Sequence, residues 1–265
     1  MRFADQVVVI TGAARGIGLT TAQMAAKEGA IVVVCDLDAA KVDAAVRNIG
    51  GRTMGVTGDV SDLAQVRRNV DEVMKSHGRI DVLINNAAIT SYHAPELLPE
   101  DVWRREIDVC LAGTFFWAQS VGVASMIPRR QGVIVNVGSG AALAAVPRCT
   151  AYVAAKHGVV GLTRSLATDW GQYNIRVNCV CPGLTFTELS KFVATKNPEM
   201  MKQREMRIPL QRGAQPEDVA NAILFLASAE ANSISGEALS VDGGTLAMSS
   251  GFSAPRDGSG TSPPA

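Results

Sequence analysis

The stretch VVVITGAARGIG, residues 7–18, joins a short apolar run to a helical pattern through three closely spaced glycines. Val7–Ile10 is typical of a buried parallel strand, and Ile17–Lys27 has helical spacing. Glycines at such a junction allow a tight turn and let a pyrophosphate approach the helix N-terminus. The spacing is Gly-x-x-x-Gly-x-Gly and not the commoner dinucleotide fingerprint, so a plain turn is the alternative interpretation.

Short apolar runs continue to alternate with helical patterns after this stretch. The alternation indicates an α/β fold, a doubly wound parallel sheet with helices on both faces, joined by right-handed crossovers. Ser61 and Thr150 are expected to cap the helices that follow them. The remaining strands are expected at Ile31–Cys35, Thr53–Thr57, Val82–Asn85, Val133–Val137, Ile175–Val180 and Ala238–Val241.

No linker divides the chain, so residues 1–250 are expected to form a single dinucleotide-binding and catalytic domain. From Ser249 onward the composition turns to Gly, Ser, Pro and Thr, which predicts a flexible tail over residues 251–265. The long helix is expected from Pro99–Glu100 to about Met126.

Composition and charge limit the kinds of partner. Lys plus Arg and Asp plus Glu both number 25, so neither nucleic acid nor an anionic membrane is expected to bind. No apolar run reaches the length of a membrane span, and the N-terminus leads into a strand and not a signal peptide. Five cysteines, an odd number within apolar segments, indicate reduced thiols in the cytoplasm. Cys179 and Cys181 face the same side of a strand, but no His lies close by in sequence, so no metal site is expected.

A carboxylate ends the second expected strand. Asp36 lies 18 residues after Gly18, where it can accept a hydrogen bond from a ribose 2′-hydroxyl and repel a 2′-phosphate. This placement favours NAD over NADP, although Arg15 beside the phosphates favours NADP. Asp36 can instead cap the next helix, a role that Asp38 is also able to fill.

Polar residues follow the third and fourth strands. Asp59-Val60 comes after the third strand, where the adenine is expected, and Asn85-Asn86-Ala87-Ala88 ends the fourth. Side chains at the carboxyl ends of parallel strands reach a ligand in the crevice there. Each Asn is also a common turn former, which is the alternative explanation.

Tyr152 and Lys156 lie four residues apart, with Ser139 thirteen residues upstream. Residues at this spacing share one helix face, so the ammonium lowers the pKa of the phenol from its free value of about 10. The phenol can then exchange a proton near neutral pH while the serine holds a substrate oxygen. Taken alone, the Tyr–Lys pair is most often an ordinary surface pair.

In family order, these motifs together with Asn178–Gly183, Thr187 and the ending Val241-Asp242-Gly243-Gly244 resemble the short-chain dehydrogenase/reductase family over Phe3 to Ala247. The resemblance implies a seven-stranded Rossmann-type sheet, a homotetramer, and reversible hydride transfer between a secondary alcohol and a ketone. It implies that Tyr152 is the acid/base, Ser139 orients the substrate oxygen, and Lys156 lowers the tyrosine pKa and holds the nicotinamide ribose. The remaining cofactor-binding residues implied are Gly12, Arg15, Gly16, Ile17, Gly18, Asp36, Asp59, Val60, Asn86, Ala87, Pro182, Gly183, Leu184 and Thr187.

The chain departs from the family pattern at two positions. Ala88 replaces a usual glycine, and Cys110 stands where the family has a catalytic asparagine in the long helix. In the family, a water near this asparagine connects the lysine to solvent. Because the backbone carbonyl can bind that water, Cys110 is expected to be compatible with the relay.

The segment Leu189–Met206 is the part that usually folds over substrate in the family, and it carries Phe192, Met200, Met201 and Met206. Such Met-rich surface adapts to varied ligands, although core or interface packing explains it equally well. Residues expected at the mouth of the site are Thr90, Tyr92, His93 and Arg148.

The predicted function is an NAD-preferring oxidoreductase for a secondary alcohol or ketone. Substrate classes left open are polyols, sugars, cyclic alcohols, dihydrodiols and hydroxyacyl compounds. One alternative is an NADPH-dependent 3-oxoacyl reductase. Another is a weakly catalytic nucleotide-binding regulator, which Cys110 suggests and the intact Ser139, Tyr152 and Lys156 oppose.

Overall fold

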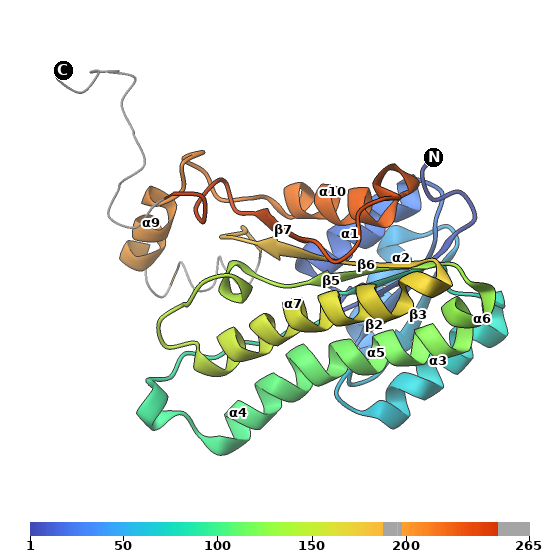
Figure 1. The fold of residues 1–265 in the computed structure, drawn as a ribbon, viewed down its shortest axis with the longest axis horizontal. Coiled ribbons are helices and arrows are strands. Elements are labelled where there is room, and N and C mark those ends of the chain that lie inside the picture. The colour runs from blue at the N-terminus through green and yellow to red at the C-terminus, as the bar shows by residue number, and fades with distance from the viewer. Residues whose placement is uncertain (188–194, 196–197, 249–265) are drawn as a thin grey trace.

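A seven-stranded parallel sheet runs through the molecule (Figure 1). The structure is a computed structural model and describes residues 1–187, 195 and 198–248. The strand order is β3-β2-β1-β4-β5-β6-β7, so the direction of winding reverses between β1 and β4. This confirms the predicted Rossmann-type domain, while the predicted tail at 251–265 lies outside the described residues. The strands are β1 (Val7–Thr11), β2 (Ile31–Asp36), β3 (Thr53–Thr57), β4 (Val82–Asn85), β5 (Gly132–Val137), β6 (Ile175–Pro182) and β7 (Ala238–Val241).

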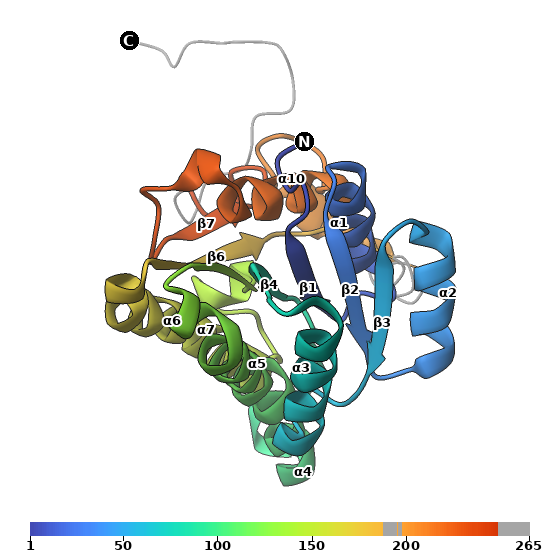
Figure 2. The ribbon, with the colours of Figure 1, turned by 90° about the vertical axis from the view of Figure 1, so that its right-hand side faces the viewer.

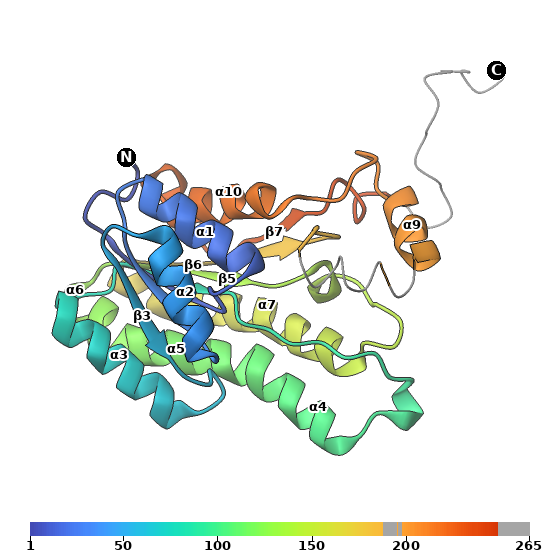
Figure 3. The same ribbon diagram turned by 180° about the vertical axis from the view of Figure 1, so that it is seen from behind.

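Helices cover both faces of the sheet, as Figures 2 and 3 show. Val8 and Ile10 of β1 pack in one apolar cluster with α1, α2 and α10, while Val7 and Val9 pack in another with α3, α5 and α7. Buried strands with apolar residues on both faces require this two-sided cover. The helices are α1 (Gly16–Lys27), α2 (Ala39–Ile49), α3 (Leu63–His77), α4 (Glu100–Ile107), α5 (Gly113–Val121), α6 (Ile127–Arg129), α7 (Thr150–Trp170), α9 (Pro198–Met206) and α10 (Pro216–Ala227).

The long helix is continuous from Glu100 to Arg129 but contains two π-helical turns, at Asp108–Ala112 and Gly122–Met126. By length and composition it reaches the size of a membrane span, so the expectation that no segment does so was wrong. Half of its most apolar stretch is buried inside the protein, where apolar residues of the helix pack on the sheet and on α3 and α7.

Two expected helix caps are wrong. Asp62 caps α3 by accepting hydrogen bonds from Ala64 and Gln65, because the Ser61 hydroxyl is bound to Asp59 instead. Helix α7 begins at Thr150 itself, and its N-cap, Cys149, makes no side-chain cap hydrogen bond. Asp38 caps α2, which leaves the Asp36 carboxylate available at the sheet edge.

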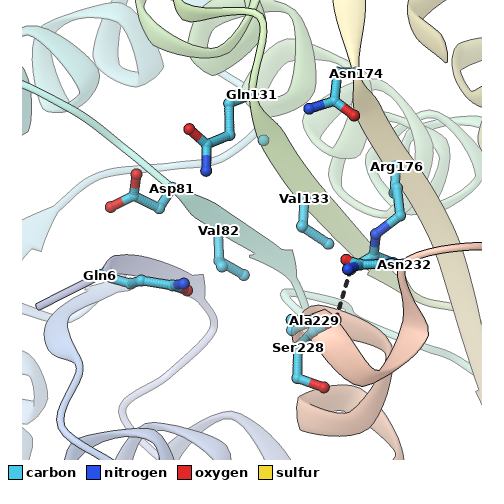
Figure 4. Close-up of a pocket in the computed structure, with 12 residues that line it drawn as sticks. Gln6, Asp81, Val82, Gln131, Val133, Asn174, Arg176, Ser228, Ala229 and Asn232 are labelled. Atoms are coloured by element: carbon cyan, nitrogen blue, oxygen red, sulfur yellow. Dashed lines mark hydrogen bonds between the residues drawn. The ribbon is translucent and has the colours of Figure 1, made fainter. Parts of the chain in front are cut away.

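The predicted site residues gather at the carboxyl ends of β1, β2, β4, β5 and β6. A hollow of about 380 Å³ lies at the opposite edge, beside the first residues of β4 and β5 (Figure 4). Gln6, Asp81, Asn174 and Arg176 are among its lining residues, and none of the predicted site residues lines it. It is therefore separate from the candidate active site.

Candidate active site

Ser139, Tyr152 and Lys156 come together where β5 meets α7. Ser139 lies two residues after the end of β5, and its Oγ accepts a hydrogen bond from the amide of Ala141 at 3.1 Å. The Lys156 ammonium, on a residue only 2% exposed, donates to the carbonyl of Val137 at 2.7 Å. Its Nζ lies 5.6 Å from the centroid of the Tyr152 ring. The helical spacing thus places a cation beside the phenol, as the sequence predicts.

Opposing effects act on the pKa of the Tyr152 phenol. Burial raises its pKa above the ordinary value of 10.0, and this effect outweighs the lowering by Lys156 and by Ser139. The expected direction of the Lys156 effect is therefore right, while the overall shift in this cofactor-free protein is upward. The phenol is held as a proton donor whose ionisation responds to any added positive charge.

Cys110 lies beside this group, at the first π-helical turn of the long helix. It is fully buried, and its thiol donates to the carbonyl of Ile89 at 3.2 Å. Its own carbonyl accepts the Thr114 hydroxyl at 2.9 Å. Lys156 acts on the Cys110 thiol electrostatically, although burial dominates and raises the thiol pKa. The Cys110 carbonyl therefore takes part in a side-chain hydrogen bond within the helix.

A buried polar network fixes the elements that carry the site. Asn85 of β4 donates to the side-chain oxygen of Asn136 of β5 at 2.9 Å, and Asn136 donates to Thr163 of α7 at 2.9 Å. Asn85 also donates to the carbonyl of Thr114 in α5 at 3.3 Å. Sequence reasoning missed this network, because a single Asn at a strand end is indistinguishable from a turn former.

The glycine turn after β1 is held against the end of β4. Asn86 donates from its side-chain amide to the carbonyls of Thr11 and Gly12, both at 2.9 Å. A Cβ atom at Gly12 would lie 2.8 Å from the Cα of Ala87, and Gly12 has φ +62°. Asn86 therefore shapes the turn with its side chain, and Ala87 leaves room only for glycine opposite it.

Thr11, which the sequence interpretation did not assign to the site, completes this junction. Its hydroxyl oxygen accepts the amides of Asn86 and Ala87 at 3.0 and 3.1 Å. The signal available in the sequence is only a Thr before the first glycine, which is common in turns.

The N-terminus of α1 is suited to an anion. Its N-cap residue, Arg15, makes no side-chain cap hydrogen bond, and its first turn contains no acidic residue. Gly16, with φ +56°, and Ile17 and Gly18 form that first turn. Backbone N–H groups at an uncapped helix start, with the positive end of the helix dipole, favour a phosphate group.

Asp36 lies next to this turn. One of its carboxylate oxygens accepts the amide of Ala14 at 3.1 Å, and the other accepts that of Leu37 at 2.8 Å. Asp36 therefore reaches back to the glycine turn from β2, where its carboxylate can accept a hydrogen bond from a ribose hydroxyl. The residues present fit a dinucleotide at this edge of the sheet.

Asp59 and Val60 lie further along the same edge. Burial raises the pKa of the Asp59 carboxyl, but hydrogen bonds from Arg105 and Ser61 together lower it by more. The pKa of Asp59 is therefore below its ordinary value. The Arg105–Asp59 contact is 2.7 Å, and sequence reasoning had not identified Arg105. Val60 is buried against Gly113 of α5.

The segment after β6 runs beside β7 and returns to the glycine turn. The amide of Gly183 donates to Val241 at 2.9 Å, and a Cβ atom there would lie 2.7 Å from Cβ of Asp242. The Thr187 methyl lies 3.6 Å from the position of a Cβ built on Gly16. The path from the end of β6 to the glycine turn thus includes Pro182, Gly183, Leu184 and Thr187.

At the expected mouth, the amide of His93 donates to the carbonyl of Arg148 at 2.9 Å. Met201 is 5% exposed, and Met206 lies in the same helix, α9. Most of Leu189–Asn197, including Phe192, lies outside the described residues, as does the Met200 side chain.

Comparison with known proteins decides the family. The sequence profile described as "Enoyl-(Acyl carrier protein) reductase" matches residues 12–245. A 3-oxoacyl-[acyl-carrier-protein] reductase FabG of Thermotoga maritima is 40% identical, covering 89% of this chain and 96% of its own length. An NAD-dependent glycerol dehydrogenase of Listeria innocua is 38% identical over 88% and 91% of the two chains. The chain belongs to the short-chain dehydrogenase/reductase family.

A solved structure of this family, the crystal structure of gox2181, has the same fold. It superposes with a TM-score of 0.90 at 34% identity and covers 93% of this chain and 98% of its own. The chain is therefore an enzyme of the short-chain dehydrogenase/reductase family, with an oxidoreductase fold over nearly its whole length. Among the described residues, no group of three or more His, Cys, Asp or Glu side chains is arranged to hold a metal ion.

In this family the bound nicotinamide supplies or accepts the hydride, and the protein positions it. The Tyr152 phenol lies beside Lys156, an arrangement that can exchange a proton with an oxygen placed against the phenol. The Ser139 hydroxyl, which lowers the pKa of the Tyr152 phenol, is a group that can hydrogen-bond an oxygen at the same place. Lys156 is anchored to the carbonyl of Val137, which holds its Nζ over the Tyr152 ring.

We expect Cys110→Asn to change kcat by no more than about tenfold, or roughly 1.4 kcal/mol. The main-chain carbonyl at position 110 is present in both proteins, and the thiol is a weak hydrogen-bond partner in any case. Steady-state kinetics of the two proteins with one alcohol measure this. If the wild-type protein binds NAD without turning over any alcohol and Cys110→Asn becomes active, the side chain and not the carbonyl is required.

Proposed function

We propose that this enzyme is an NAD-preferring dehydrogenase of small secondary alcohols, working reversibly on the corresponding ketones. The observation that carries the proposal is the set formed by Ser139, Tyr152 and Lys156 where β5 meets α7, with Lys156 Nζ 2.7 Å from the carbonyl oxygen of Val137. The glycerol dehydrogenase relative makes polyols the first substrates to test. Five buried, unpaired cysteines in the described chain support a reducing, cytoplasmic location.

The NAD preference rests on Asp36. A carboxylate beside the glycine turn meets the group that distinguishes the two cofactors, and it repels a 2′-phosphate. We expect wild-type kcat/KM to be higher with NAD than with NADP. Asp36→Ala should narrow the ratio by about tenfold or more, since about 1.4 kcal/mol of repulsion corresponds to tenfold.

Initial rates with both cofactors test this preference. Asp38→Ala is the matched control, because Asp38 caps α2 two residues away and should leave the cofactor ratio unchanged. A wild-type protein with higher kcat/KM for NADP would contradict the assignment of Asp36.

The second candidate is an NADPH-dependent 3-oxoacyl reductase. It is favoured by the 40% identity to the FabG reductase and by the description of the matching profile. This function predicts that kcat/KM for reducing a 3-oxoacyl thioester with NADPH is higher than kcat/KM for oxidising any secondary alcohol with NAD. Binding of NAD with no turnover of any of these substrates would support a nucleotide-binding regulator instead.

We further propose that the enzyme assembles as a homotetramer. Some apolar residues of α5 and α7 are buried within the subunit and do not contribute to an interface, namely Ala118, Val159 and Leu166. Other apolar residues on or beside these two helices are only partly buried and leave apolar surface there: Leu111, Phe115, Phe116 and Leu162. Light scattering at micromolar concentration is expected to give four times the mass of 27.8 kDa. A monomer mass would contradict it.

A further inference from the structure

Cys179 and Cys181 form a pair of buried thiols next to Gly138, the residue that precedes Ser139 in the chain. Both cysteines belong to β6 and have no exposed surface, and their Sγ atoms are 3.7 Å apart. Side chains at positions i and i+2 of a strand share one face, so the contact follows from the sequence spacing. Neither thiol has a role in the site described above.

Gly138 occupies the space that the two sulfurs leave. A Cβ atom built on Gly138 would lie 2.8 Å from Sγ of Cys179 and 2.9 Å from Sγ of Cys181. The next nearest atom is the carbonyl oxygen of Val180, at 3.5 Å, which is an ordinary contact distance. Gly138 does not have a positive φ, so its backbone conformation suits other residues as well. The sulfurs are therefore what restricts position 138 to glycine.

The surroundings hold both the chain and the sulfurs in place. The amide of Gly138 donates to the carbonyl of Val180 at 2.8 Å, which ties this stretch to the strand of the two cysteines. On their other side the sulfurs pack in an apolar cluster with Ala142 and with Val159 and Val160 of α7. A sulfur that moves away from Gly138 therefore displaces its neighbours in this cluster.

Electrostatic effects connect Cys181 with the catalytic group. The neighbouring Cys179 thiol lowers the pKa of Cys181 and burial opposes it, while the main chain of Ser139 and the charge of Lys156 lower the pKa further. The overall direction is downward. The sulfur of Cys181 is thus close to the main chain of Ser139 as well as to Gly138.

We propose that Cys179 and Cys181 are positioning residues, which hold Ser139 where its hydroxyl meets the substrate oxygen. The proposal rests on the oxidoreductase function above. The two sulfurs fill the space beside Gly138 and so determine the path of the chain at the adjacent Ser139. Displacement of a positioned group by about 1 Å can cost a hundredfold in rate, so this support matters for catalysis. Neither cysteine touches the substrate or exchanges a proton with it.

Gly138→Ala tests the proposal, because the added methyl group meets both sulfurs and displaces the chain next to Ser139. We expect the single-turnover rate of NAD reduction by an alcohol to fall about tenfold to a hundredfold. The NAD dissociation constant should not change. Gly161→Ala is the matched control on α7, since no atom lies within 4 Å of its Cβ position, and it should keep the wild-type rate.

Removing the sulfurs should cancel the effect of the added methyl group. The double variant Cys179→Ala/Cys181→Ala is expected to lose about threefold to tenfold in the same rate, because Ser139 loses its support. Adding Gly138→Ala to this double variant should cause no further loss, since the nearest remaining atom is then the Val180 oxygen at 3.5 Å. An equal loss from Gly138→Ala in both backgrounds would mean that the sulfurs do not transmit the effect, and it would overturn the proposal.

The pH profile separates positioning from general packing. Burial raises the pKa of Tyr152 and Ser139 lowers it, so moving Ser139 away should raise the pKa further. In Gly138→Ala the increase of the oxidation rate with pH should therefore shift to higher pH, and the triple variant should reverse this shift. A lowered rate with the wild-type pH profile would assign the two cysteines a packing role only.

Thermal melts follow the same contact without turnover. Gly138→Ala should lower Tm in the wild-type background and leave it unchanged in the double alanine background. A wild type that oxidises no alcohol and reduces no ketone would refute the proposed function, while the melts would still decide whether the sulfurs hold the chain at Gly138. If Gly138→Ala does not fold, the double alanine variant decides alone: a wild-type rate and pH profile there would overturn the proposal.

Discussion

Tyr152→Phe is expected to lower kcat by about 10²–10⁴ while NAD binds with nearly unchanged affinity. The substitution removes the hydroxyl, the acid–base group, and keeps the ring above which Lys156 lies. Its dissociation constant for NAD, from quenching of intrinsic fluorescence, should stay within about twofold of the wild type, since the change removes only one hydrogen-bonding group.

A matched control is Tyr173→Phe, because Tyr173 lies after α7 at the far end of that helix from Tyr152. This control should retain the wild-type kcat. Turnover of Tyr152→Phe comparable to the wild type, with unchanged NAD affinity, would show that the proton comes from another group.

Gly18→Ala is expected to weaken NAD binding by roughly tenfold to a hundredfold. A Cβ atom at this position would contact the carbonyl oxygen of Gly12, and it would lie 2.6 Å from Nδ2 of Asn86 and 2.9 Å from the Cα of Ala13. These atoms belong to the turn itself or hold it, so the turn must shift. Overpacking of this kind costs about 1–3 kcal/mol, which corresponds to that loss in affinity if the bound turn bears the strain.

Isothermal titration with NAD measures the effect, with a thermal melt to follow folding. Gly171→Ala is the control, because no atom lies within 4 Å of its Cβ position and its φ of −55° suits any residue. Unchanged NAD affinity in Gly18→Ala would mean that the dinucleotide does not rest on this turn.

The strands were predictable because period and composition act locally. Val7–Thr11 and Ile31–Asp36 are apolar on both faces, and such runs between helical patterns have few alternatives to a buried parallel strand. The helix pair of Tyr152 and Lys156 was predictable for the same reason, since four-residue spacing determines a shared face. What these short-range patterns determine is which residues share a face.

The features that sequence reasoning missed depend on contacts between distant segments. The hydrogen bond between Asn85 and Asn136 joins residues 51 positions apart, and the Arg105–Asp59 pair spans 46. Burial of Glu106 is likewise a property of how α4 packs on α7, while its residue type predicts an exposed helix surface. The net upward shift of the Tyr152 pKa also follows from burial, which spacing alone does not report.

The most direct test of the central claim measures the rate at which NAD is reduced in the presence of secondary alcohols, beginning with polyols. The wild type and Tyr152→Phe are assayed side by side. The account predicts turnover of at least one alcohol by the wild type. That rate should increase with pH as the phenol, whose pKa burial raises, becomes the phenolate that accepts the proton. Tyr152→Phe should be nearly inactive at every pH. Equal rates in the two proteins, or no turnover of any alcohol by a wild type that binds NAD, would contradict the assignment.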